Sequence, residues 1–133
     1  MSPPARTDGA PVLIVEDDRD IRELLGAFFE MRGCSVILAA DGQQALDELA
    51  RADPLPCFIL LDFRMPRIDA FAFRAVQERD PRLAAIPVVL CSAAPELRET
   101  AAQLGAAAWL KKPFEPEDLL GVLRRFRASG CEP

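Results

Sequence analysis

The sequence contains no histidine among its 133 residues. This absence excludes Ser-His-Asp and Cys-His catalysis, imidazole ligands for a metal, and a phosphohistidine carried by the chain itself. The four cysteines, Cys34, Cys57, Cys91 and Cys131, form no C-x-x-C pair. We therefore expect reduced and mostly buried cysteines rather than disulfides or a zinc site.

Long apolar runs and an excess of positive charge are also lacking. No apolar run approaches the roughly 18 residues that a membrane-spanning helix needs, and residues 1–10 contain no apolar signal core. We therefore expect a cytoplasmic protein that binds no membrane. The 16 basic and 21 acidic residues give a net charge of −5, which disfavours a nucleic-acid-binding surface.

Strand-length apolar runs alternate five times with segments of helical periodicity. The predicted strands are residues 12–15, 35–39, 58–61, 88–91 and 107–110. Such alternation predicts an α/β fold, a doubly wound five-stranded parallel sheet covered by five helices. The length fits a single domain.

Apolar spacing and capping residues delimit the helices. Asp41 with Gln44 resembles a capping box that opens the second helix, and residues 69–79 predict a weaker third one. Gly105 ends the fourth, and Pro116 is suited to the first turn of the last. One face of the first helix is formed by Ile21, Leu24, Leu25, Phe28 and Phe29.

Polar residues follow four of the predicted strands. Glu16 and Asp17 follow the first strand, Asp62 the third, Ser92 the fourth and Lys112 the fifth. Right-handed crossovers place these strand ends at one edge of the sheet, where ligands bind in such folds. Each residue alone is typical of a cap, a turn or an exposed surface. Together, carboxylates that need a divalent cation, a hydroxyl and a lysine are the groups that formation of an aspartyl phosphate requires.

Four segments resemble the receiver domain of two-component response regulators, over about residues 11–128. In that interpretation residues 1–10 form a disordered lead and residues 129–133 a C-terminal tail. The resemblance implies the flavodoxin-like strand order 2-1-3-4-5. The four segments are Leu-Ile-Val-Glu-Asp at 13–17, Leu-Leu-Asp-Phe-Arg-Met-Pro at 60–66, Leu-Cys-Ser-Ala at 90–93 and Gly-Ala-Ala-Ala-Trp-Leu-Lys-Lys-Pro-Phe at 105–114.

The resemblance implies a Mg²⁺ site around a phosphoacceptor. Asp62 is then the phosphoacceptor and a metal ligand, and Asp17 is the direct metal ligand beside it. Glu16 acts mainly through water, and the backbone carbonyl of Arg64 completes the coordination by the protein. Lys112 contacts the phosphoryl group and precedes a cis proline.

The resemblance also implies a switch. Ser92 moves towards the phosphoryl oxygens, and the ring of Trp109 follows into the vacated space. Three positions depart from the family pattern. Trp109 stands where Tyr or Phe is usual, Ala70 replaces a frequent glycine, and Arg64 places a long cation near the acceptor.

The function implied is a stand-alone, phosphorylation-dependent signalling switch. A histidine kinase or a histidine phosphotransfer protein donates to Asp62, and the surface of the fourth helix, fifth strand and fifth helix changes for a downstream protein target. On this interpretation the chain is no enzyme beyond its own phosphorylation and slow autodephosphorylation.

Three alternatives stay open from the sequence. A receiver-like binding module that works without phosphorylation is supported by Trp109 and Arg64. A phosphatase of the haloacid dehalogenase class resembles D-x-D, but the second acidic position here is Arg64. A flavodoxin-like nucleotide binder is disfavoured, because no Gly-rich loop follows the first strand.

Overall fold

The computed structural model describes residues 9–65 and 67–127, and its sheet confirms the predicted class and order. Five parallel strands lie in the order β2-β1-β3-β4-β5. The predicted lead up to residue 8 and the tail at 129–133 lie outside the described residues. The strands are β1 (Val12–Val15), β2 (Val36–Ala39), β3 (Phe58–Asp62), β4 (Val88–Ser92) and β5 (Ala108–Lys111).

Five helices alternate with the strands, and the second and fifth begin where Asp41 and Pro116 predict. They are α1 (Arg19–Glu30), α2 (Gly42–Arg51), α3 (Ala70–Arg79), α4 (Leu97–Leu104) and α5 (Pro116–Phe126). The Asp18 side chain caps α1, and Asp41 accepts a hydrogen bond from the Gln44 backbone at 2.8 Å. In a capping box the Gln44 side chain would accept from the backbone N–H of Asp41. It accepts instead from the N–H of Ala40, one residue before the cap. Gly105 ends α4 with a φ of 72°.

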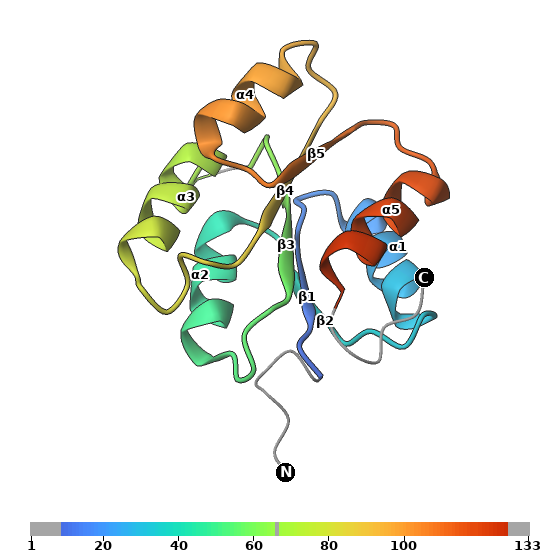
Figure 1. Ribbon diagram of the computed structural model, residues 1–133, viewed down its shortest axis with the longest axis horizontal. Helices are drawn as coiled ribbons and strands as arrows, with labels where there is room; N and C mark the ends of the chain where they lie inside the picture. The colour runs from blue at the N-terminus through green and yellow to red at the C-terminus, as the bar shows by residue number, and fades with distance from the viewer. Residues whose placement is uncertain (1–8, 66, 128–133) are drawn as a thin grey trace.

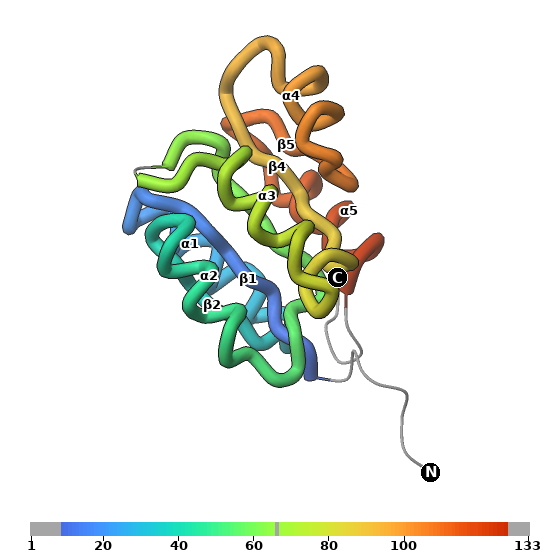
Figure 2. Tube along the Cα trace, turned by 90° about the vertical axis from the view of Figure 1, so that its left-hand side faces the viewer, coloured from blue at the N-terminus to red at the C-terminus, as the bar shows by residue number. Residues whose placement is uncertain are grey.

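The helices cover the sheet on both sides. Figure 1 shows α1 and α5 on one side and α2, α3 and α4 on the other. The buried apolar residues form two clusters, one under α1 and α5 and one under α2, α3 and α4. The side view of Figure 2 places α4 and β5 towards one end of the sheet, away from β2. Both faces of the central strands are buried, which explains their continuous apolarity. No helix in residues 9–65 or 67–127 is long and apolar enough to cross a membrane.

Leu24 is the exception to the predicted core face of α1. Its side chain is 72% exposed, whereas Leu25 and Phe29 are buried. A Cβ at Gly26 would lie 3.3 Å from Leu38 on β2, so the helix approaches the sheet closely on the Gly26 side. This rotates the buried face away from Leu24.

Gly42 at the start of α2 packs closely against Ile68 in the loop after β3. An added Cβ would lie 3.0 Å from the backbone oxygen of Ile68 and 3.2 Å from its Cβ. Gly42→Ala is therefore expected to destabilise the fold by about 1–2 kcal/mol, in the range of overpacking. Gly121→Ala, with no atom within 4 Å of its added Cβ, is expected to stabilise by about 0.5–1 kcal/mol through helix propensity. Urea unfolding measures the change in the free energy of unfolding of both variants. Equal changes would contradict the prediction that close packing at Gly42 excludes a Cβ.

Candidate functional site

The carboxyl ends of the strands bring the predicted site residues to one cleft. Asp62 and Ser92 are the last residues of β3 and β4, Glu16 follows β1, and Lys112 follows β5. Because β1 pairs with β3, and β4 pairs with both β3 and β5, these ends are neighbours. The cleft has a volume of about 310 Å³ and is lined by Glu16, Asp17, Asp18, Ile21, Asp62, Arg64, Ser92, Ala93 and Lys112.

Lys112 joins two buried carboxylates. Its Nζ donates to Glu16 Oε1 at 2.9 Å and to Asp62 Oδ1 at 3.0 Å. The side chains of Glu16 and Asp62 are only 4% and 6% exposed. Charges removed from water to this extent need a partner, and we call Glu16, Asp62 and Lys112 the ion triad.

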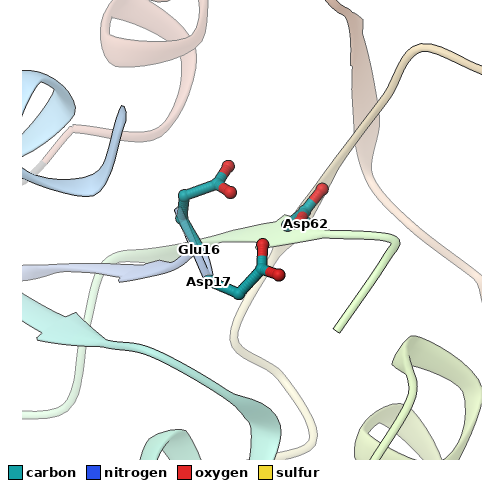
Figure 3. Close-up of side chains that lie close together, drawn as sticks. All are labelled: Glu16, Asp17 and Asp62. Carbon is teal, nitrogen blue, oxygen red and sulfur yellow. The ribbon is translucent and has the colours of Figure 1, made fainter. Parts of the chain in front are cut away.

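The carboxylate oxygens of the cleft differ in whether they already accept hydrogen bonds from the protein. Glu16 uses both, because Oε2 also accepts a hydrogen bond from the Asp18 backbone at 3.1 Å. Asp62 uses Oδ1 for Lys112. Among the described residues, no hydrogen-bond donor reaches Asp62 Oδ2 or either carboxylate oxygen of Asp17. Figure 3 shows these two carboxylates beside Glu16 at the strand ends. Two carboxylates therefore have oxygens available to a ligand.

The charge in the cleft is not balanced. Burial raises the pKa of Asp62 from 3.8 to about 6; Lys112 opposes this, while the negative charges of Glu16 and Asp17 add to it. Burial lowers the pKa of Lys112, but its hydrogen bonds to Glu16 and Asp62 outweigh this and raise it above 10.5. The two directions are consistent, because three carboxylates face one ammonium. Lys112 is held positive while Asp62 still lacks compensation.

A divalent cation fits this set of oxygens. One carboxylate oxygen from each of Glu16, Asp17 and Asp62 lies within 4.8 Å of the others. Mg²⁺ prefers hard oxygen ligands and is held by one or two carboxylates plus water and phosphate oxygens. The available oxygens of Asp17 and Asp62 suit direct ligation, whereas the engaged oxygens of Glu16 suit contact through water.

Ser92 presents a hydroxyl to the cleft, and no acceptor for its proton lies among the residues that the structure describes. Its Oγ accepts a hydrogen bond from the Ala94 backbone at 3.0 Å, and the side chain is buried. An accepting hydroxyl keeps its own O–H for donation. The next strand is fixed beside it, because the Lys112 backbone donates to the Ser92 carbonyl at 2.9 Å.

The family model of the response regulator receiver domain matches residues 12–124 of this chain. The chain belongs to the response regulator receiver domain family. Such domains are signalling switches of two-component systems, which interact with histidine kinases and downstream targets. The resemblance inferred from the four motifs is thus confirmed.

Relatives and solved structures agree with this assignment. Protein PilG of Pseudomonas aeruginosa is 32% identical over 121 residues, which cover 90% of this chain and 88% of PilG. The chain spans only about half the length of several other curated relatives it matches. The chemotaxis response regulator CheY4 of Vibrio cholerae superposes with a TM-score of 0.79 at 32% identity, covering 88% of this chain and 98% of CheY4.

A further solved structure bears on the metal. The receiver domain of sensor histidine kinase PA1611 from Pseudomonas aeruginosa has a TM-score of 0.78 at 29% identity, covering 89% of this chain and 97% of that one. That structure has a magnesium ion coordinated in its active-site cleft.

The receiver domain brings most predicted site residues together. Arg64 lines the cleft with the acidic residues, Ser92 and Lys112, and the bond between Lys112 and Pro113 is cis, as the resemblance implied. Trp109 lies on β5 with its side chain 46% exposed and does not line the cleft. Sequence reasoning did not find Arg22, whose guanidinium contacts the backbone beside the acidic residues. The available signal was its place one turn after the Asp18 cap.

Proposed function

We propose that this receiver domain is a phosphoacceptor switch in which Asp62 takes a phosphoryl group from a phosphohistidine. The donor is a histidine kinase or a histidine phosphotransfer protein. One observation carries the proposal: the buried Asp62 carboxylate has one oxygen on Lys112, and its other oxygen has no hydrogen-bond donor within residues 9–65 and 67–127. The cleft beside it is lined by Asp17, Ser92 and Lys112.

The transfer needs no general base. An Asp62 oxygen forms a bond to phosphorus while the phosphorus–nitrogen bond of the donor breaks, and its electron pair stays on the imidazole nitrogen, which takes a proton from its surroundings. An ionised carboxylate is already a nucleophile, so the lack of histidine in the chain is no obstacle.

Six of the residues that line the cleft have a role in this proposal. Lys112 holds the Asp62 carboxylate ionised and neutralises charge that develops on the phosphoryl oxygens. Ser92 donates its hydroxyl proton to one of those oxygens. Asp17, Asp62 and the Arg64 carbonyl would hold Mg²⁺ directly, and Glu16 would hold it through water. When bound, the cation compensates the charge of the carboxylates and of the incoming phosphate.

The output belongs to the same proposal. Phosphorylation biases an equilibrium between two arrangements of the α4, β5 and α5 surface, which binds a downstream protein target. Ser92 and Trp109 are the switch residues of this proposal, and Trp109 is 46% exposed. The expected cytoplasmic location stays a prediction.

A small-molecule phosphodonor tests the proposal directly. The protein is incubated with Mg²⁺ and acetyl phosphate, and intact mass is followed together with tryptophan emission, which comes from Trp109 alone. We expect one labile phosphoryl adduct that is absent in EDTA, with a change of emission as it forms. No adduct with any donor would favour the phosphorylation-independent binding module. An adduct with unchanged emission would remove Trp109 from the switch, and rapid turnover of donor would favour a phosphatase.

A further inference from the structure

The guanidinium of Arg22 reaches from the first turn of α1 back to the acidic turn after β1. Its Nη1 donates to the backbone oxygen of Glu16 at 2.8 Å and is 3.4 Å from that of Asp17. The Arg22 backbone is itself fixed, because its N–H donates to the Asp18 carbonyl at 2.9 Å. One side chain therefore contacts the carbonyls of both residues that precede the helix cap.

These contacts matter because, within the described part of the chain, no hydrogen bond to the Asp17 carboxylate orients it. Among the described residues no donor contacts its carboxylate, which is exposed at the rim of the cleft. Its direction then depends on the backbone from residue 16 to residue 18. The N–H of Glu16 is held by Ala39 at 3.0 Å and that of Asp18 by Glu16 Oε2 at 3.1 Å. Arg22 holds the carbonyl side of the same turn.

The positive charge of Arg22 also stabilises the acidic turn that it contacts. Arg22 places a permanent positive charge against a turn whose carboxylates repel Asp62. Unlike Lys112, its guanidinium contacts backbone oxygens and leaves the carboxylates free for a ligand. The contact thus restrains Asp17 without occupying the oxygens that a metal would use.

We propose that Arg22 is a positioning residue for the Mg²⁺ site, which aims the Asp17 carboxylate by holding the carbonyls of Glu16 and Asp17. The inference rests on the proposed function only for the identity of the cation. Partners that orient a metal ligand typically change metal affinity 10- to 100-fold when they are removed. A group that stabilised only the helix would change the unfolding temperature and leave the affinity of the folded protein unchanged.

The test measures Mg²⁺ binding by isothermal titration calorimetry on the metal-free protein, without phosphodonor. Arg22→Gln is expected to weaken binding about tenfold. Arg19→Gln is the matched control, because it removes the same charge one turn earlier, where the 77% exposed side chain pairs with Glu23. We expect less than a twofold change there. Thermal unfolding in EDTA shows that each variant is folded.

Arg22→Lys tests whether the geometry of the guanidinium contacts matters in addition to the positive charge. It also replaces Arg22→Gln in the experiment if that variant does not fold. Lysine keeps the positive charge but lacks the planar fork of donors, so we expect binding several-fold weaker than that of the original protein. Affinity equal to the original in Arg22→Lys, or in Arg22→Gln, would overturn the inference, as would equal weakening in Arg19→Gln. An original protein that binds Mg²⁺ but forms no adduct would overturn the proposed function alone.

Discussion

Asp62→Asn is expected to abolish the phosphoryl adduct and, at the same time, to make the metal-free protein more stable. The adduct is lost because the amide has no nucleophilic carboxylate oxygen. The gain in stability follows from the raised pKa of Asp62, about 6 against 3.8. Since burial and the charges of Glu16 and Asp17 outweigh the attraction of Lys112, the ionised form is held at a cost that asparagine does not have.

The sign of the pH dependence follows from linkage. Between about pH 4 and pH 6 the folded protein binds the Asp62 proton more tightly than the unfolded chain does, so stability falls as pH rises through this interval. The shift from 3.8 to about 6 corresponds to about 3 kcal/mol above pH 6, as an order of magnitude. We therefore expect Asp62→Asn to gain about 1–3 kcal/mol at pH 7 and little at pH 4.

Urea unfolding in EDTA at pH 4 to 8 measures this, with Asp53→Asn as the control for the same change at an exposed carboxylate. The advantage of Asp62→Asn should shrink when Mg²⁺ is added, because the cation compensates Asp62 in the original protein. A variant less stable than the original at pH 7 in EDTA would contradict the prediction and show that the Lys112 ion pair outweighs the burial.

Lys112→Met is expected to have the opposite effect and the largest one on stability. It leaves Glu16 and Asp62 buried without their shared counter-charge. Removing one partner of a buried ion pair typically costs about 3–5 kcal/mol, and we expect a loss of that size at pH 7 in EDTA. Adduct formation should slow by about 100-fold or more, as on removal of one electrostatic contact to a transition state.

A double-mutant cycle with Asp62→Asn isolates the interaction. In that background Lys112→Met leaves only Glu16 uncompensated, so its cost should be smaller by about 1–2 kcal/mol. The raised pKa of Lys112 means that its favourable contribution is complete below pH 10.5 and is lost only at higher pH, so measurements at pH 5 to 8 are unaffected by its titration. Lys111→Met, at the exposed neighbouring position, controls for the loss of one lysine. Equal costs of the two substitutions would contradict the role of the ion triad.

The fold and the principal side chains of the site could be predicted because they follow from local patterns. Buried strands are continuously apolar, Asp41 and Gly105 mark helix ends, and the polar residue at each strand end is visible in the sequence. Parallel topology then places those ends together without further information.

What could not be predicted depends on distances between elements. The exposure of Leu24 follows from how closely α1 approaches β2 at Gly26, which periodicity does not contain. The contact of Arg22 with two carbonyls depends on the angle between the acidic turn and α1. The pKa of Asp62 depends on burial and on three neighbouring charges, which only coordinates combine.

The ion triad joins residues that are far apart in the chain, since Lys112 follows Glu16 by 96 positions and Asp62 by 50. During synthesis Glu16 and Asp62 therefore leave the ribosome well before Lys112, whose ammonium pairs with both. A nascent chain that ends before β5 has Asp62, the proposed phosphoacceptor, but not the lysine that compensates its charge. On the proposed function, competence to receive a phosphoryl group would then arise only once Lys112, which follows β5, has been made.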